Sequence, residues 1–438
     1  MNKPSLVISC PIDTYSGYGA RARDFVKALI NLDKYNVNIL PQRWGHTPEF
    51  FLDDNEEWTY LKKYLINGLQ EQPDIWIQHT IPPEFQPIGK FNIGLTAGIE
   101  TTNCKPEWIQ GLNKMNLIIG SSAHTIDVFK NSTYQQVDKR NNEVVGTIQL
   151  QKPLEVLFEG VDTTVYKPEK SNFKLNKVKE DFCYLFVGHW MQGNVGEDRK
   201  NVGLLVKGFL ELFKNKKNPP ALILKTSSGT TSHMDRNNIL KKIDVIKKSI
   251  NADKLPNIYL VHGDLSNQEM NSLYNHKKVK AMVSLTKGEG YGRPLLEFTM
   301  TKKPVITTGW SGHLDFLDPN LSILLSGELK NVDKSAANNW IISDSKWFNV
   351  DLQSFANAMM AVYTDYETYL RRGKSQGTKN KKEFSLEAMQ NKLDSIFDKH
   401  IPEFPKQVSI NLPKLKKVGK KQNLPKVNLP KLKKLANA

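Results

Sequence analysis

The stretch Ser284-Leu-Thr-Lys-Gly-Glu-Gly-Tyr-Gly-Arg-Pro-Leu-Leu-Glu297 decides the fold class of this sequence. Residues 281–285, apolar except for Ser284, overlap its start and predict a buried strand. Glycines at positions 288, 290 and 292 then predict a turn, and Pro294 is typical of the first turn of a helix. A strand, a glycine-rich turn and a helix in direct succession indicate an α/β protein with a parallel sheet.

This stretch carries two carboxylates, Glu289 at the carboxyl end of the strand and Glu297 just over one turn into the helix. We expect both at one cleft, where glycines let a ligand approach the backbone and helix N–H groups bind anions. A nucleotide-diphosphate sugar suits this arrangement. Glu289 would bind sugar hydroxyls and Glu297 the ribose hydroxyls. Phosphate or sugar oxygens would meet the backbone amides of Gly290, Tyr291 and Gly292. Solvated glutamates in an ordinary α/β protein would give the same pattern.

Seven residues separate Glu289 from Glu297, and Pro304-Val-Ile306 follows them. This pattern resembles the E-x7-E signature of retaining glycosyltransferases of the GT-B fold, family four. Residues 308–312, Thr-Gly-Trp-Ser-Gly, are similar to a branch of that family. Arg293 departs from the pattern, because many members have an aliphatic residue there, and it adds positive charge beside the expected phosphate site.

The resemblance covers residues 5–400 and implies GT-B architecture, with two Rossmann-like parallel-sheet domains facing each other across a cleft. A chain of 438 residues fits two domains of roughly 170 to 220 residues. Glu159-Gly-Val-Asp162 and Val165-Tyr-Lys-Pro168 resemble the crossing between them. We expect an acceptor-side domain (1–168), a linker (169–180), a donor domain (181–383), a closing helix that packs back on the first domain (384–400) and a basic tail (401–438).

Strands and helices alternate along both halves of the sequence, as a parallel sheet requires. In the first half we expect strands at 5–10, 37–40, 74–78, 91–96, 117–120 and 154–157, and helices at 20–32, 58–69, 106–115 and 122–130. Alternating polar and apolar residues at 134–150 predict a surface hairpin. In the second half we expect strands at 182–188, 221–225 and 258–261, and helices at 202–213, 235–250, 266–275, 352–364 and 385–398.

Two parts of the first half supply candidates for the cleft. Gly17 and Gly19 follow the first strand, and we expect a loop there that lets the substrate approach the backbone, with a tight structural turn as the alternative. His79 and Glu100 follow later strands, at the carboxyl ends where open sheets bind ligands. The resembled family places a histidine or an acidic residue near these points, which makes both catalytic candidates. Glu100 is favoured over His79, and a structural hydrogen bond is the alternative for each.

Three cations of the second half are candidates for binding the donor diphosphate. Arg199 and Lys200 lie in a loop before a helix, where the resembled family neutralises this group. Lys225 ends a strand that is otherwise aliphatic, and a lysine there rarely helps packing. Because such cations stabilise a leaving diphosphate, Arg199 and Lys225 are also catalytic candidates. Solvated surface charge is the alternative, and Arg21 and Arg23 at the start of the first helix leave the same two options open.

Charge stabilisation by these side chains and by helix amides implies transfer without a metal or a cofactor. No D-x-D triplet lies in a suitable donor loop, and the histidines are scattered. The resemblance implies retention of anomeric configuration, with Glu289 among the catalytic candidates. The expected partners are a nucleotide-sugar donor and an acceptor hydroxyl on a nucleic acid, a glycan or a lipid-linked glycan, whereas the oligomeric state is not predicted.

The overall composition is that of a globular protein, with 39% hydrophobic and 24% charged residues. No apolar run approaches the roughly 18 residues that span a bilayer, and no signal sequence precedes Ser5, so we expect a cytoplasmic protein. Cys10, Cys104 and Cys183 are isolated from one another and lie beside apolar sequence. They predict buried free thiols instead of disulfides or a zinc site.

Much of the formal charge of +16 lies at the C-terminal end, because residues 403–438 contain ten lysines and a single acid. The unit Asn411-Leu-Pro-Lys-Leu-Lys-Lys417 recurs at 428–434, and its prolines oppose a continuous helix. Two interpretations stay open. The tail is either a solvated appendage or a segment that binds a polyanion such as a nucleic acid, an anionic lipid or a charged glycan.

The favoured function is a glycosyltransferase, for hexosyl or pentosyl groups, whose acceptor could be a polyanion such as modified DNA or an anionic glycolipid. Three other functions stay open. A nucleotide-sugar epimerase of the same fold would share the donor site. A glycogen-phosphorylase-like enzyme would need a lysine bound to pyridoxal phosphate. A non-enzymatic protein on a transferase scaffold would bind nucleic acid through the tail.

Overall fold

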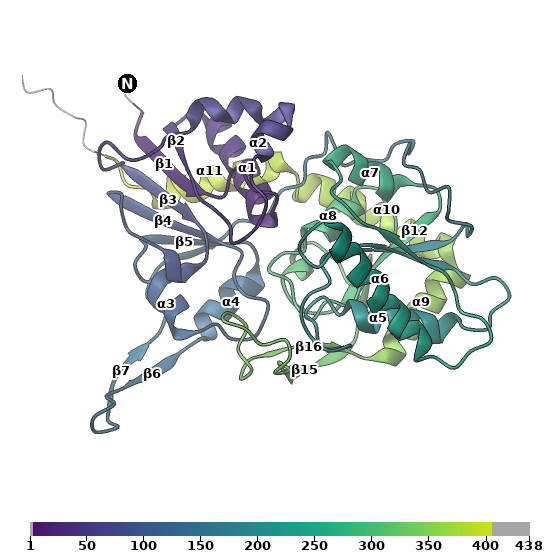
Figure 1. The fold of residues 1–438 in the computed structure, drawn as a ribbon. Helices are drawn as coiled ribbons and strands as arrows, with labels where there is room; N and C mark the ends of the chain where they lie inside the picture. The colour runs from purple at the N-terminus through teal and green to yellow at the C-terminus, as the bar shows by residue number, and fades with distance from the viewer. Residues whose placement is uncertain (1–2, 405–438) are drawn as a thin grey trace, which may run out of the picture. The chain divides into compact units, whose positions relative to one another are not determined.

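The computed structural model describes residues 3–404. It contains two six-stranded sheets, and every neighbouring pair of strands in them is parallel (Figure 1). This is the expected α/β architecture with two Rossmann-like sheets. We call residues 3–168 the first half and residues 169–404 the second half. The predictions for the basic tail lie outside the described residues.

The first sheet has the strand order β2-β1-β3-β4-β5-β8. Its strands are short apolar runs, and β3 is buried along its whole length, as in a sheet that is covered on both faces. Ile8 of β1 lies between Ile39 of β2 and Ile77 of β3. The strands are β1 (Ser5–Cys10), β2 (Asn36–Pro41), β3 (Ile75–His79), β4 (Phe91–Thr96), β5 (Leu117–Gly120) and β8 (Leu154–Val156).

Helix α1 (Gly17–Leu32) begins three residues earlier than expected. Ser16 caps it, since its side chain accepts a hydrogen bond of 2.9 Å from the Gly19 N–H. Gly17 and Gly19 therefore lie in the first helical turn, and the prediction of a glycine loop was wrong at these positions. The other helices of this half are α2 (Phe51–Asp54), α3 (Pro106–Leu112) and α4 (Ala123–Asn131). The helix expected at 58–69 is a 3₁₀ segment, η1 (Glu56–Tyr64).

The hairpin expected at 134–150 is present as β6 (Tyr134–Val137) and β7 (Val144–Ile148). Among the strands of residues 3–404 its two strands pair only with each other, and Val137, Val144 and Val145 are exposed. The hairpin is thus an addition to the first half and takes no part in its sheet.

The second sheet has the order β11-β10-β9-β12-β13-β14. Strand β9 lies at its centre between β10 and β12, and four of its five residues are buried. The strands are β9 (Cys183–Val187), β10 (Ala221–Lys225), β11 (Ile258–Val261), β12 (Val279–Ser284), β13 (Val305–Thr308) and β14 (Ile323–Leu325). The helices are α5 (Val202–Phe213), α6 (His233–Lys248), α7 (Asn267–Asn275), α8 (Arg293–Thr299), α9 (Leu352–Thr364), α10 (Tyr366–Glu383) and α11 (Leu386–His400).

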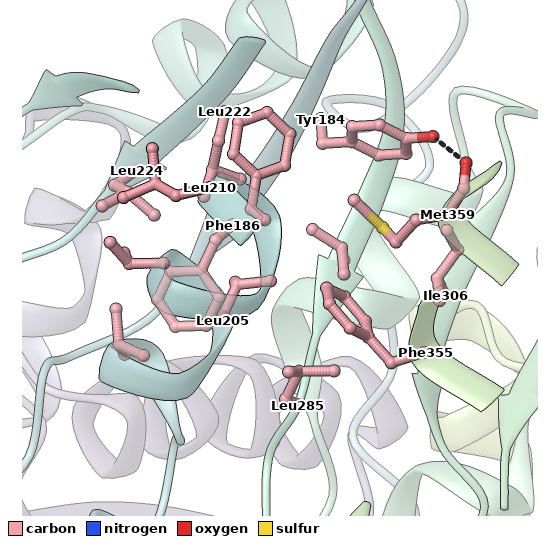
Figure 2. Packing of buried hydrophobic residues seen from close by; sticks show 14 of the residues in the cluster. Tyr184, Phe186, Leu205, Leu210, Leu222, Leu224, Leu285, Ile306, Phe355 and Met359 are labelled. Carbon is pink, nitrogen blue, oxygen red and sulfur yellow. Dashed lines mark hydrogen bonds between the residues drawn. The ribbon is translucent and has the colours of Figure 1, made fainter. Parts of the chain in front are cut away.

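One apolar cluster joins the second sheet to α5, α6 and α9. Figure 2 shows Phe355 and Met359 of α9 together with Tyr184 of β9, whose hydroxyl donates a 2.6 Å hydrogen bond to the Met359 carbonyl. Because this hydroxyl is buried, the bond offsets the cost of removing it from water. Full burial of a side chain such as Phe355 contributes about 1.5–3 kcal/mol. The cluster therefore fixes α9 on the sheet that carries the site described below.

An antiparallel arm, β15 (Gly327–Asn331) and β16 (Lys346–Val350), leaves the second half after β14 and was not predicted. It reaches the first half, where Lys346 and Thr102 exchange two hydrogen bonds of 2.8 and 2.9 Å. Ile341 and Trp347 of the arm belong to one buried cluster with Trp108 of α3. The arm thus joins the two halves by apolar packing as well as hydrogen bonds.

Helix α11 returns to the first half, where it packs on α1. Lys34, just after α1, forms ion pairs of 2.5 Å with Asp394 and 2.9 Å with Asp398. The Val161 N–H donates to the Phe384 carbonyl at 2.9 Å just before α11. Cys10, Cys104 and Cys183 are buried free thiols, as predicted. Within residues 3–404, no helix has the length and apolar character needed to cross a bilayer.

Candidate functional site

A cavity of about 480 Å³ lies where the carboxyl ends of strands from both sheets meet. Its wall takes residues from three parts of the chain. The first half contributes Gly17, Tyr18, Arg21, Trp44, Ile81, Ala97, Gly98, Ile99, Glu100, Trp108 and Glu159, the second half contributes Met191, Arg199, Glu289, Gly290, Tyr291, Gly292 and Arg293, and the arm contributes Asn338, Trp340 and Ile341. A concave site with a few converging polar groups is where a ligand is expected.

The glycine-rich turn between β12 and α8 lies directly against the first half. A Cβ at Gly288 would approach the Glu100 carbonyl to 2.1 Å, and one at Gly290 would approach the Ala97 carbonyl to 2.6 Å. Gly292 has a φ of +94°, a conformation that favours glycine. Ser122 also donates a 2.6 Å hydrogen bond to the Gly290 carbonyl. Gly288 and Gly290 therefore let two segments of the chain approach closely, whereas the sequence suggested an approach by a ligand.

Glu289 is held by two cations of the loop before α5. The Lys200 Nζ lies 2.5 and 2.7 Å from its two carboxylate oxygens, and the Arg199 Nη1 lies 3.5 Å from one of them. The backbone N–H of Glu289 donates to the Ser311 hydroxyl at 2.9 Å. Burial alone would raise the pKa of Glu289, but the charges of Lys200 and Arg199 lower it to about 2. Glu289 is therefore a carboxylate at neutral pH.

Arg199 connects this carboxylate to Glu100 of the first half. Its Nη1 donates to the Gly288 carbonyl at 2.9 Å and lies 3.2 Å from Glu100 Oε1. Burial opposes the charge of the guanidinium, but Glu100 and Glu289 together raise its pKa above the ordinary value. The structure thus brings four predicted residues into one cluster: Glu100, Arg199, Lys200 and Glu289.

Lys225 lies at the carboxyl end of β10, as predicted, but outside the cavity wall. Its Nζ donates a 2.8 Å hydrogen bond to the Gly263 carbonyl. Burial lowers the pKa of this lysine, and the nearby charge of Asp264 opposes that shift. Lys225 is therefore a cation of the same sheet edge that stands apart from the cluster around Glu289.

Glu297 is also outside the cavity wall, and it accepts a hydrogen bond from Arg293. The Arg293 Nε lies 2.8 Å from Glu297, and its Nη1 lies 2.6 Å from Asp24 of α1. Burial would lower the pKa of Arg293, but the two carboxylates raise it well above the ordinary value. The sequence suggested that Arg293 adds positive charge beside a phosphate. In the structure two carboxylates offset this charge, and Arg293 links α8 to α1.

Three candidates of the first half differ in their access to the cavity. Gly17 is exposed and lines the wall. A Cβ at Gly19 would come within 2.4 Å of the Thr14 carbonyl, so tight packing explains this glycine. His79 is fully buried behind Tyr18, outside the wall, and neither ring nitrogen has a hydrogen-bond partner in the described chain. Burial, with a contribution from Arg21, lowers the pKa of His79 well below its ordinary range.

Sequence reasoning missed the aromatic part of the wall, which consists of Tyr18, Trp44, Trp108 and Trp340. Trp44 follows β2, and its place just after a strand was an available signal. Trp340 belongs to the unpredicted arm. Arg21 and Arg23 are buried and donate to backbone carbonyls, among them Thr96 at 3.2 Å and Ile12 at 2.8 Å, so they serve the structure of the first half.

No protein-family model matches this sequence, and no curated protein matches it. Several solved structures are similar. A glycosyltransferase from Rickettsia africae has a TM-score of 0.60 at 13% identity, over 92% of this chain and 99% of that one. Sucrose-phosphate synthase from Thermosynechococcus elongatus has 0.59 at 12%, over 91% and 99%. Anabaena HepE in complex with UDP and glucose has 0.57 at 10%, over 90% and 100%. These likenesses show that the chain has the GT-B fold.

Proposed function

We propose that this protein is a glycosyltransferase that moves a sugar from a nucleotide-diphosphate sugar to an acceptor hydroxyl. The observation that carries the proposal is the cluster of Arg199, Lys200, Glu289 and Glu100 at a cavity between two Rossmann-like sheets. Two cations and two carboxylates can serve both parts of such a donor. Cations bind the diphosphate, and carboxylates accept hydrogen bonds from sugar hydroxyls.

The reaction breaks the bond between the anomeric carbon of the sugar and a diphosphate oxygen, and it forms a bond between that carbon and the acceptor oxygen. Negative charge develops on the leaving oxygen, and the departing diphosphate can accept the proton that the acceptor hydroxyl loses. Lys200 and Arg199 would stabilise that charge, because preorganised cations in a partly buried site act strongly on a developing anion. Burial lowers the pKa of Lys200, although Glu289 opposes that shift. Glu289 would then position the sugar. Transfer without a metal follows from this assignment and is part of the proposal, as are retention of configuration and membership of family four.

The similar structures support a nucleotide-sugar donor. HepE was solved with UDP, with UDP and glucose and with UDP-glucose, and an Escherichia coli structure similar at a TM-score of 0.56 contains UDP-2-fluoro glucose. UDP-glucose is therefore the first donor to test. Lys225 and Glu297 remain proposed donor ligands, as do the backbone groups of 290–292. Glu297 would have to share Arg293 with Asp24 while it binds the ribose.

Nucleotide release from a panel of UDP-, GDP- and ADP-sugars tests the proposal. The wild type should release nucleotide from one of them, and Lys200→Ala should lower turnover about 10²- to 10³-fold, the usual loss for one group that stabilises a developing anion. Lys248→Ala is the matched control, since Lys248 is exposed and pairs with Asp244 on α6. Equal turnover in wild type and Lys200→Ala would refute the assignment.

Two further arms of the same assay test the details. Turnover should survive an excess of chelator, and loss with chelator followed by recovery with manganese or magnesium would refute the role given to the cations. Analysis of the sugar product without an added acceptor identifies an epimerase, because that enzyme would convert the donor sugar by itself.

A further inference from the structure

We propose that the first-half side of the cavity binds a neutral carbohydrate ring, with Trp44 and Trp340 as its aromatic walls. This inference rests on the proposed glycosyl transfer and names the class of acceptor. The two tryptophans come from distant parts of the chain, one from the loop after β2 and the other from the arm of the second half.

Trp44 is the outer member of a stack of three rings. Tyr18 lies between Trp44, at 3.8 Å and 19° between planes, and His79, at 5.0 Å and 26°. The Tyr18 hydroxyl accepts a 3.1 Å hydrogen bond from the Ala97 N–H and lies 3.3 Å from the Thr96 hydroxyl. Trp44 itself is half-buried. The stack is therefore fixed at its centre and presents Trp44 at the cavity wall, which gives buried His79 a structural role.

Trp340 is 44% exposed and lies at the end of the arm. The Asn338 side chain accepts hydrogen bonds of 2.8 and 2.9 Å from the N–H groups of Trp340 and Ile341, which closes a tight turn. The Trp340 ring meets Trp108 of α3 edge to face, with centroids 6.4 Å apart. Neighbouring Ile341 is buried in the same cluster as Trp108. The arm thus places an exposed ring beside the first half and keeps it there.

The polar groups of this side of the wall suit a ligand that donates hydrogen bonds. Glu100 and Glu159 supply carboxylates. One oxygen of Glu100 lies near Arg199, and the Glu100 side chain is a quarter exposed. Trp108 Nε1, a buried polar atom of the same side of the wall, has no hydrogen-bond partner within residues 3–404. Sugar hydroxyls would supply partners for all of them. The electron-rich faces of tryptophan rings attract the C–H groups of a sugar.

Charge argues against a nucleic acid in this part of the cavity. A base would stack on the same rings, but its flanking phosphates need lysine or arginine partners. Within the described residues, Arg21 is the one cation that the first half contributes to the wall. It is 3% exposed and donates to the carbonyls of Thr96 and Leu157, both at 3.2 Å. A neutral oligosaccharide matches this wall better than a polyanion does.

The test compares two acceptor panels, each with the donor sugar that the nucleotide-release assay selects. One panel holds maltotriose, cellotriose and chitotriose, and the other holds single-stranded and duplex oligonucleotides with 5-hydroxymethylcytosine. We expect transfer to at least one oligosaccharide. In Trp44→Ala and in Trp340→Ala the KM for that oligosaccharide should rise at least tenfold, and Trp340→Phe should recover most of the loss because it keeps a ring. Tyr60→Ala is the control, since Tyr60 is a 40% exposed aromatic residue outside the cavity wall.

Several results would overturn the inference: transfer to the oligonucleotides alone, no oligosaccharide that accepts sugar, or an unchanged KM in both alanine variants. Thermal unfolding of each variant shows whether a change in KM reflects a damaged fold. A wild type that releases nucleotide from no donor would instead refute the proposed function, so the two failures are distinguishable.

Discussion

The two edges that meet at the cavity are built alike and carry opposite chemistry. Each consists of carboxyl ends of parallel strands followed by loops and helices. The second-half edge holds Glu289, whose carboxylate lies 2.5 Å from Lys200 Nζ and 3.5 Å from Arg199 Nη1. The first-half edge holds the ring stack that ends in Trp44. The comparison teaches that a repeated framework brings the strand ends of both sheets to one cavity, whereas the side chains at those ends give its two sides different chemistry.

The largest expected effect concerns Arg293, which links α8 of the second half to Asp24 of α1 in the first half and also pairs with Glu297 of its own helix. Arg293→Met should lower the free energy of unfolding by about 3–5 kcal/mol, because it leaves two buried carboxylates without their cation. Urea denaturation measures the loss. Lys248→Ala removes an exposed ion pair and should cost at most about 1 kcal/mol. An equal, small loss in both variants would show that Arg293 does not stabilise the junction.

A smaller effect concerns the pH dependence of the free energy of unfolding, which should distinguish the charged edge from the aromatic one. The pKa of Glu289 is about 2 in the folded protein against an ordinary 4.5, so the charged carboxylate stabilises the fold above pH 4.5 and this contribution disappears as the pH falls toward 2. Relative to Glu289→Gln, the wild type should lose about 2 kcal/mol of unfolding free energy between pH 7 and pH 3. Urea denaturation at both pH values measures it, and a constant difference would contradict the ion pairing with Lys200.

The smallest effect is expected at Lys225, which belongs to the charged edge but stands outside the cavity wall. Lys225→Ala should weaken donor binding about tenfold, near the lower end of the range for a charged hydrogen bond. Calorimetric titration with the donor measures the change. Unchanged affinity would remove Lys225 from the donor site and leave the cluster around Glu289 as the whole charged edge.

Much of the fold could be predicted, because apolar periodicity dominates the sequence of most strands and helices. The bounds of α5, β10 and α9 agree with the sequence prediction. Helix α10 was missed because its buried face consists of Gly373, Gln376, Gly377 and Asn380, which give no apolar pattern. The arm was missed because all five residues of β15 are exposed.

The site could be predicted only in part. Arg199, Lys200 and Glu289 lie together, as the strand-end positions suggested. The sequence could not show that Arg293 meets Asp24, since 269 positions separate them and only the packing of α8 on the first half joins them. It likewise could not bring Trp340 beside Trp108, because that contact depends on the arm.

The central claim is that the second-half edge binds the nucleotide part of the donor and the first-half edge does not. Calorimetric titration of wild type, Lys200→Ala and Trp44→Ala with UDP, GDP and ADP tests it most directly. One of these diphosphates should bind the wild type, and Lys200→Ala should lose at least ten times more affinity for it than Trp44→Ala does. Equal losses, a larger loss in Trp44→Ala, or no binding of any diphosphate to the wild type would contradict the account.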